Sequence, residues 1–119
     1  LPFAPYCVQG SERLRQQFAF DMIPGNTLTC PGFYAPQGRV LRLPLKNENL
    51  LQDYNTFADG DFKLTNFEME TAGYYALGRM LGHEMLSLNA IVADRIGQRF
   101  AENADEIIDD LILKVLDRV

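Results

Sequence analysis

Two acidic residues flank a methionine at the point where an alternating segment changes into a helical pattern. Glu68 and Glu70 are two positions apart, so on an extended backbone both carboxylates lie on one side and Met69 faces the other. Carboxylates at the open end of a strand can accept hydrogen bonds from the hydroxyl groups of a ligand. The alternative is that both acids are solvated and stabilise the N-terminus of the following helix through its dipole.

A second polar group lies in residues 31–39, Pro-Gly-Phe-Tyr-Ala-Pro-Gln-Gly-Arg, whose two prolines and two glycines predict a loop without a regular element. Gln37 offers an amide acceptor and donors in one plane, which complements the acceptor, N–H, acceptor edge of uracil. Arg39 offers a fork of donors and a permanent charge, which suits a carbonyl that gains negative charge. Phe33 offers a flat face for stacking on a base. Alternatively, Gln37 and Arg39 are solvated and Phe33 belongs to the core.

The elements that must position these residues follow an α/β pattern. Alternating patterns predict strands over residues 26–30 and 62–67, and the almost wholly apolar run 85–93 predicts a strand buried on both faces. Helical patterns over 70–81 and 103–119 follow the last two strands. This order predicts a βαβα unit with parallel strands and right-handed crossovers, so the polar residues at the strand ends should border one cleft.

The remaining segments are predicted to frame that unit. Ser11 is expected to be the N-cap of a short helix, and residues 40–45 are expected to be a short extended piece. Residues 47–57 are predicted to be a helix, with Leu50, Leu51 and Tyr54 facing inward. Asn103-Ala104-Asp105-Glu106 resembles a capping box, and the helix that it opens is assigned a packing role without chemistry.

Composition excludes several classes of protein. With 11 basic and 16 acidic residues the formal charge is −5, which argues against binding along a nucleic-acid backbone. No apolar run is long enough to span a bilayer, and no signal-peptide pattern is present at the first residues. Cys7 and Cys30 lack metal or redox spacing and predict two reduced thiols in a cytoplasmic protein. His83 is the only histidine, so no metal site is expected.

The two polar motifs together resemble the nucleoside phosphorylase family. Residues 33–39 resemble the uracil-recognition loop of uridine phosphorylases, and residues 66–70, Asn-Phe-Glu-Met-Glu, resemble the ribose-binding Glu-Met-Glu motif of the wider family. Asp94-Arg95 falls where uridine phosphorylases usually carry Asn-Arg. The resemblance covers essentially all 119 residues. Nucleosidases share the Glu-Met-Glu motif, so the loop with both Gln and Arg is the more specific signal for a pyrimidine.

The resemblance implies a three-layer α/β/α fold with a mixed sheet, of which residues 1–119 form the C-terminal part of a single domain. Family members are longer, and their N-terminal half carries the glycine-rich turn and the arginines that hold phosphate. They are homo-oligomers, dimers or hexamers, with active sites at subunit interfaces. We therefore expect the isolated chain to be inactive and to need further polypeptide for stability.

The reaction that the resemblance implies is phosphorolysis of uridine to uracil and ribose 1-phosphate. Phosphate is the co-substrate, and neither a metal nor another cofactor is implied. Gln37 would bind N3–H and an adjacent carbonyl, Arg39 would stabilise the leaving base anion, and Phe33 would pack on the base.

The remaining positions that match the family would complete the nucleoside site. Glu70 would hold the ribose hydroxyls, Met69 would pack on the sugar, and Glu68 would border the base–ribose site. Arg95 would support the base pocket from behind, unless it forms a structural ion pair with Asp94 or Glu68. Met69 has the alternative of simple packing.

One departure from the family pattern bears on substrate choice. Purine-specific relatives place an Asp near the position of Asp94, where its proton goes to the purine N7. A purine nucleoside phosphorylase, a nucleosidase and an inactive chain that only binds nucleoside or oligomerises therefore stay open as alternatives. Gln37 and Arg39 favour uridine.

Overall fold

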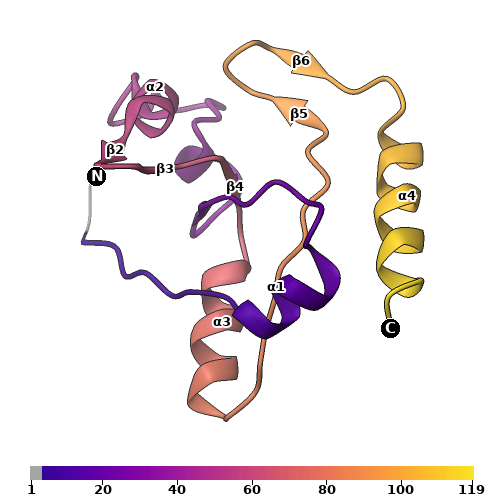
Figure 1. Cartoon of the computed structure of the whole chain (residues 1–119). Coiled ribbons are helices and arrows are strands. Elements are labelled where there is room, and N and C mark those ends of the chain that lie inside the picture. The colour runs from indigo at the N-terminus through magenta and orange to yellow at the C-terminus, as the bar shows by residue number, and fades with distance from the viewer. Residues whose placement is uncertain (1–3) are drawn as a thin grey trace.

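The computed structural model describes residues 4–119, which form helices and short strands in an α/β arrangement (Figure 1). The helices are α1 (Glu12–Phe18), α2 (Leu50–Thr56), α3 (Thr71–Met80), α4 (Ala104–Leu116) and the 3-10 helix η1 (Ala35–Gln37). The strands are β1 (Thr27–Thr29), β2 (Ala58–Asp59), β3 (Phe62–Lys63), β4 (Asn66–Glu68), β5 (Ala93–Asp94) and β6 (Arg99–Phe100). Within these residues no helix is both long and apolar enough to cross a membrane.

The parallel pair of β1 and β4 is the centre of the fold. Thr27 lies opposite Asn66 and Thr29 lies opposite Glu68. The Cys30 amide extends the ladder by donating to the Glu68 carbonyl at 2.7 Å. The predicted strand over 26–30 is thus confirmed over Thr27–Thr29, and it pairs in parallel with β4.

A small hydrophobic core lies between this pair and α2. Cys30, Leu50 and Tyr54 are buried, and partly buried side chains pack against them, namely Leu28, Leu51, Leu64 and Phe67. The inward-facing residues predicted for the 47–57 helix are therefore confirmed, with Leu51 only half-buried. Burial of these aromatic and aliphatic side chains fixes α2 beside the loop that follows β1.

The predicted strand over 62–67 is divided into two. β3 turns back on β2 around Gly60, whose φ of 58° confirms the predicted Asp59-Gly60 turn. β4 leaves that hairpin and pairs with β1 instead. Thr65 lies between them and donates its amide to the Asn26 carbonyl at 2.9 Å, which starts the new ladder.

The prediction of a buried strand over 85–93 is wrong. Only Ala93 belongs to a strand, β5, which pairs antiparallel with β6. A strand needs a hydrogen-bonded neighbour, and no described residue pairs with 86–91. The described residues consequently form three two-stranded sheets, and the βαβα sheet is not assembled. Residues 40–45 likewise form no strand.

The helix boundaries agree with prediction, whereas some details differ. Ser11 is the N-cap of α1 and accepts a hydrogen bond from the Leu14 amide at 3.1 Å. Asn103 occupies the N-cap of α4, but its side chain bonds the Glu106 carboxylate at 3.3 Å and no helix amide. On α3 the inward stripe is shorter than predicted, since Leu77 and Met80 are exposed.

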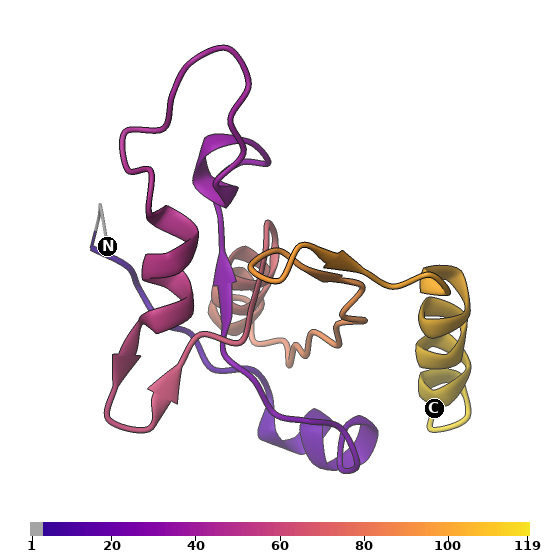
Figure 2. The same ribbon diagram turned by 90° about the horizontal axis from the view of Figure 1, so that it is seen from above.

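The C-terminal helix stands to one side of the molecule (Figure 2). None of its residues is buried, although Ile107, Leu111 and Val115 are half-covered. Arg118 fixes its end by binding the Asp21 carboxylate at 2.7 Å, after α1. The predicted packing role is therefore only partly fulfilled within this chain.

Candidate functional site

The parallel register brings two of the predicted site segments to one edge of the fold. Because the carboxyl ends of β1 and β4 lie together, the loop 31–39 and the junction 68–70 leave the pair at the same edge. Figure 2 shows η1 lying beyond the end of β1. This edge carries the polar residues for which the sequence predicts ligand binding.

Phe33, Gln37 and Arg39 are brought into direct contact. Nη1 of Arg39 donates to the Oε1 atom of Gln37 and, at 2.7 Å, to the Phe33 carbonyl. The guanidinium carbon lies 3.7 Å from the centre of the Phe33 ring, a cation–π geometry. The Gln37 side chain is buried and Phe33 is 49% exposed, so Gln37 is not a solvated loop residue and Phe33 is not core.

The loop has a fixed backbone that holds this trio. The amides of Gln37 and Arg39 both donate to the Tyr34 carbonyl, at 3.0 and 2.9 Å. One turn of 3-10 helix forms here, which corrects the expectation of a loop without regular structure. Gly38 follows with a φ of 70°, a conformation that glycine adopts without steric cost. From α2, the Tyr54 hydroxyl donates to the Pro36 carbonyl at 3.2 Å.

Glu68 is engaged in capping α3. Its Oε1 accepts the Thr29 hydroxyl at 2.6 Å, and its Oε2 accepts the amides of Glu70 and Thr71 at 2.6 and 2.8 Å. Burial opposes ionisation of Glu68, but these hydrogen bonds outweigh it and hold the pKa of the carboxyl below its ordinary value. Glu68 therefore joins β1, β4 and α3 and acts as a positioning residue.

Glu70 and Met69 face solvent beside that cap. The chain bends at both residues, and Glu70 has a φ of −130° and a ψ of −32°, so the expected extended backbone over 68–70 is wrong. The cause is Glu68, whose carboxylate draws the next amides into the helix start. Among the described residues no partner binds the Glu70 carboxylate, which is open to a ligand.

Arg95 directly follows β5 and is only partly exposed. Burial lowers the pKa of Arg95, and the positive charge of Arg39 lowers it further. Its Nη1 atom is buried and has no hydrogen-bond partner among residues 4–119. Asp94 pairs instead with Arg99 at 2.6 Å and with the Gly97 amide at 2.8 Å. The alternative of an Asp94–Arg95 ion pair is therefore wrong.

Thr29 is a site residue that sequence reasoning missed. Its hydroxyl donates to Glu68 and accepts the Ala72 amide at 2.9 Å, so it joins β1 to the start of α3. The available signal was its place at the end of the strand that precedes the Gln37 loop. Threonine is common in strands for its β propensity, so its presence there does not by itself indicate the hydrogen bonds to Glu68 and Ala72.

A large cavity of the described chain lies elsewhere. It measures about 1620 Å³ and is bordered by β1 and residues 86–91, and none of the predicted site residues lines it. The hydrogen-bonded Gln37–Arg39 pair and Arg95 all lie outside its lining. In the described residues no group of His, Cys, Asp and Glu side chains is arranged to hold a metal ion.

Comparisons of the chain with protein-family models, with curated proteins and with solved structures find no match. The identity of the site therefore depends on its motifs and on the geometry described above.

Proposed function

We propose that the chain is the base- and ribose-binding part of a uridine phosphorylase, in a nucleoside phosphorylase-like three-layer α/β/α fold. The observation that carries this proposal is the hydrogen bond from Arg39 to the buried Gln37, formed beside the exposed face of Phe33. It fixes an amide, a guanidinium and an aromatic ring on one small surface, as recognition of a pyrimidine requires.

The contacts to the base are assigned to the hydrogen-bonding groups of Gln37 and Arg39 that have no partner within the described chain. Among residues 4–119 the Nε2 group of Gln37 makes no hydrogen bond, so it is available to one pyrimidine carbonyl, while Oε1 has a second lone pair for N3–H. Arg39 has further N–H groups for the other carbonyl. Together these groups match the acceptor, donor, acceptor edge of uracil.

Two cations support departure of the base. Phosphate attacks the anomeric carbon as the bond from that carbon to N1 breaks, and the bonding electron pair leaves with uracil. Arg39, together with Arg95, whose Nη1 lacks a partner in residues 4–119, stabilises the charge that develops on the carbonyls. Arg39 is already held by the Phe33 carbonyl and by Gln37 before the reaction begins, so it needs little reorganisation.

The sugar contacts come from the junction after β4. Glu70 accepts hydrogen bonds from the ribose 2′- and 3′-hydroxyls, and Met69, 39% exposed, packs on the sugar. Glu68 holds both residues in place by capping α3. We place the activity in cytoplasmic pyrimidine salvage, in a homo-oligomer whose further polypeptide supplies the phosphate contacts.

A purine substrate is disfavoured because Asp94 is engaged by Arg99 and Gly97. Titration calorimetry of the chain with uridine and with inosine tests this choice. We expect uridine to bind at least tenfold more tightly, about 1.4 kcal/mol, and equal affinities would contradict the proposal. The isolated chain is expected to bind uridine without turning it over. In the assembled enzyme, uracil release should require phosphate, and release without phosphate would favour a nucleosidase.

A further inference from the structure

Residues 86–91 have a backbone with almost no hydrogen-bond partners. Just outside this segment, the Met85 carbonyl accepts the Ser11 amide and the Val92 carbonyl accepts the Ala101 amide, both at 2.8 Å. Within it, the Ser87 amide bonds the Tyr75 hydroxyl at 2.8 Å, and no other backbone group of 86–91 bonds a described residue. Backbone N–H and C=O groups left unpaired beside half-buried apolar side chains are unfavourable. The backbone of 86–91 can therefore accept hydrogen bonds from, and donate them to, another strand.

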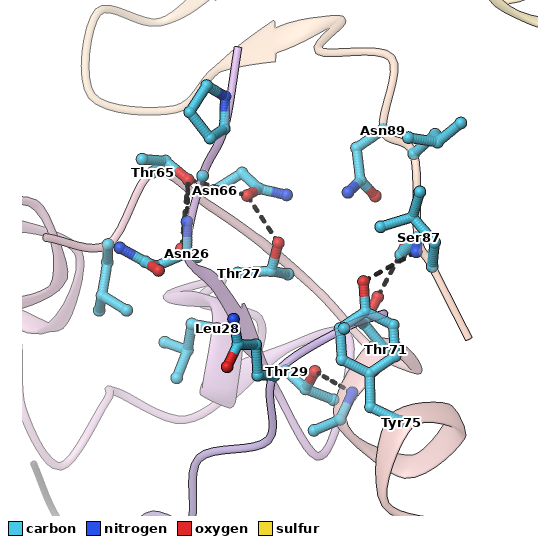
Figure 3. A pocket seen from close by; sticks show the side chains of 18 of the residues that line it. Asn26, Thr27, Leu28, Thr29, Thr65, Asn66, Thr71, Tyr75, Ser87 and Asn89 are labelled. Atoms are coloured by element: carbon cyan, nitrogen blue, oxygen red, sulfur yellow. Dashed lines mark hydrogen bonds between the residues drawn. The ribbon is translucent and has the colours of Figure 1, made fainter. Parts of the chain in front are cut away.

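A groove separates this segment from β1 (Figure 3). Both border the 1620 Å³ cavity, which all three β1 residues line and to which residues of α1 and α4 also contribute. β1 pairs only with β4, so one of its edges has no neighbouring strand among the described residues. At one end, the first residue of α3, Thr71, donates its hydroxyl to the Ser87 hydroxyl at 3.1 Å. The groove therefore has an unpaired backbone on each side.

The chain also exposes far more surface than a folded monomer of its mass. Its accessible surface is 9114 Å², whereas a 13.5 kDa monomer is expected to expose about 6,500 Å². The radius of gyration is 15.7 Å, against about 13.5 Å expected for this length. The excess surface, about 2,600 Å², is of the size that large obligate interfaces bury. Ile23, Ile91 and Leu77 are among the apolar side chains left exposed.

We propose that this groove binds an extended β-strand of a partner polypeptide, which pairs with residues 86–91 and with the open edge of β1. Added in this way, the strand would make 86–91 a sheet strand, as its apolar sequence predicts. The occupant must be apolar on the faces that meet Leu86 and Leu88, and uncharged or basic at its ends, because this chain carries a net charge of −5.

A second copy of the chain is not the occupant that the structure favours. Its described strands have at most three residues, too few to fill the groove. Residues 86–91, whose apolar sequence predicts a strand, already line one wall of the groove. The inference does not depend on the proposed reaction: the residues proposed to contact the nucleoside lie outside the groove, and only Thr29, which positions Glu68, lines it.

Hydrogen exchange measured by mass spectrometry tests the proposal on the full chain. The probe is a synthetic nine-residue peptide of alternating Val and Thr with a Lys at each end, compared with a twin N-methylated at alternate residues. The twin keeps the side chains and loses backbone donors. We expect the first peptide to slow amide exchange in 86–91 and Thr27–Thr29 at least tenfold, and the twin to have no effect. Leu88→Pro should abolish the protection, whereas Leu88→Ala, which keeps the amide, should retain it.

Three results would overturn the proposal. Protection by both peptides would show apolar contact without strand pairing, and protection by neither would show that the groove binds no strand. Protection that rises with protein concentration in the absence of peptide, together with a dimer in light scattering, would identify a second copy as the occupant. The methylated twin keeps the test decisive even if Leu88→Pro fails to fold.

Discussion

The Arg39 guanidinium stacks 3.7 Å from the Phe33 ring centre while it also donates to the Phe33 carbonyl oxygen. The same nitrogen binds Oε1 of the buried Gln37, so one cation organises both the aromatic face and the amide. A side chain held by three contacts has already lost most of its rotamer freedom, and a ligand that uses it pays less entropy on binding.

Replacing Arg39 should impair base recognition more than sugar recognition. We expect Arg39→Ala to weaken uridine binding at least tenfold in titration calorimetry, about 1.4 kcal/mol, and to leave ribose binding unchanged. In an assembled enzyme the same change should reduce the rate of phosphorolysis far more than it reduces ribose binding. The matched control is Arg42→Ala, which removes an exposed arginine from the following segment. Equal uridine phosphorolysis by mutant and parent would remove Arg39 from leaving-group stabilisation.

The loop should depend on the glycine that ends η1. At Gly38 the φ is 70° and an added Cβ would lie 2.6 Å from Cγ of Leu51, so Gly38→Ala meets both backbone strain and a clash. We expect a loss of about 2–4 kcal/mol in urea unfolding, together with weaker uridine binding. Gly60→Ala is the matched control, because Gly60 has a φ of 58° and open space around it. It should cost only about 1–2 kcal/mol of strain. Equal losses would contradict the role of the Leu51 contact.

The sequence was sufficient to predict local features that depend on neighbouring residues. Ser11 as an N-cap, the turn at Gly60 and the boundaries of α3 follow from local chemistry and are confirmed. The Gln37–Arg39 contact was also within reach, because the two residues are close in sequence.

Features that depend on distant partners were not predictable in the same way. The apolar residues 86–91 have the composition of a buried strand, but a strand forms only where a neighbour supplies hydrogen bonds. The sequence favours a ligand contact for Glu68. Its hydrogen bond to Thr29 is not visible in the sequence, because the two residues are 39 positions apart. Arg99 as the partner of Asp94 depends on the β5–β6 hairpin, whose strands have two residues each.

The Glu68 cap should make stability depend on pH. Folding lowers the pKa of this carboxyl below its ordinary value of 4.5, so its stabilising contribution is complete well above that value and is lost as the pH falls through the folded pKa. We expect Glu68→Gln to cost about 1–2 kcal/mol at neutral pH, since an amide cannot replace a charged acceptor of three hydrogen bonds. Urea unfolding from neutral pH to about pH 3 should show the gap between parent and mutant closing. A gap that stays constant across this range would contradict the capping role.

The two cysteines should differ sharply in reactivity. Cys30 is 1% exposed, and burial, followed by the charge of Glu68, raises the pKa of its thiol to about 11. Since the thiolate is the nucleophile, Cys30 should resist alkylation at neutral pH, whereas the exposed Cys7 should react. Mass spectrometry after iodoacetamide treatment should show one adduct on the native chain and two after denaturation. Two adducts on the native chain would show that the core around Cys30 opens readily.

The position of α4 should depend on one ionic link. Arg118 donates to both Asp21 oxygens, at 2.8 and 2.7 Å, and its hydrogen bond is the main cause that lowers the pKa of Asp21 to about 2. Because folding lowers this pKa, the link is intact above the ordinary value of 3.8 and is lost as the pH falls through about 2. Arg118→Ala removes the link and also the bond to the Phe18 carbonyl, so amides of 104–116 should exchange faster.

High salt should produce part of the same effect in the parent chain, because exposed ion pairs are screened. Arg13→Ala is the control, since Arg13 pairs with Glu84, away from α4. Unchanged exchange in α4 after Arg118→Ala would mean that its half-covered apolar residues, and not this ion pair, hold the helix. If exchange in α4 is faster in Arg118→Ala but unchanged in Arg13→Ala, the ion pair of Asp21 and Arg118 is what attaches this weakly packed helix.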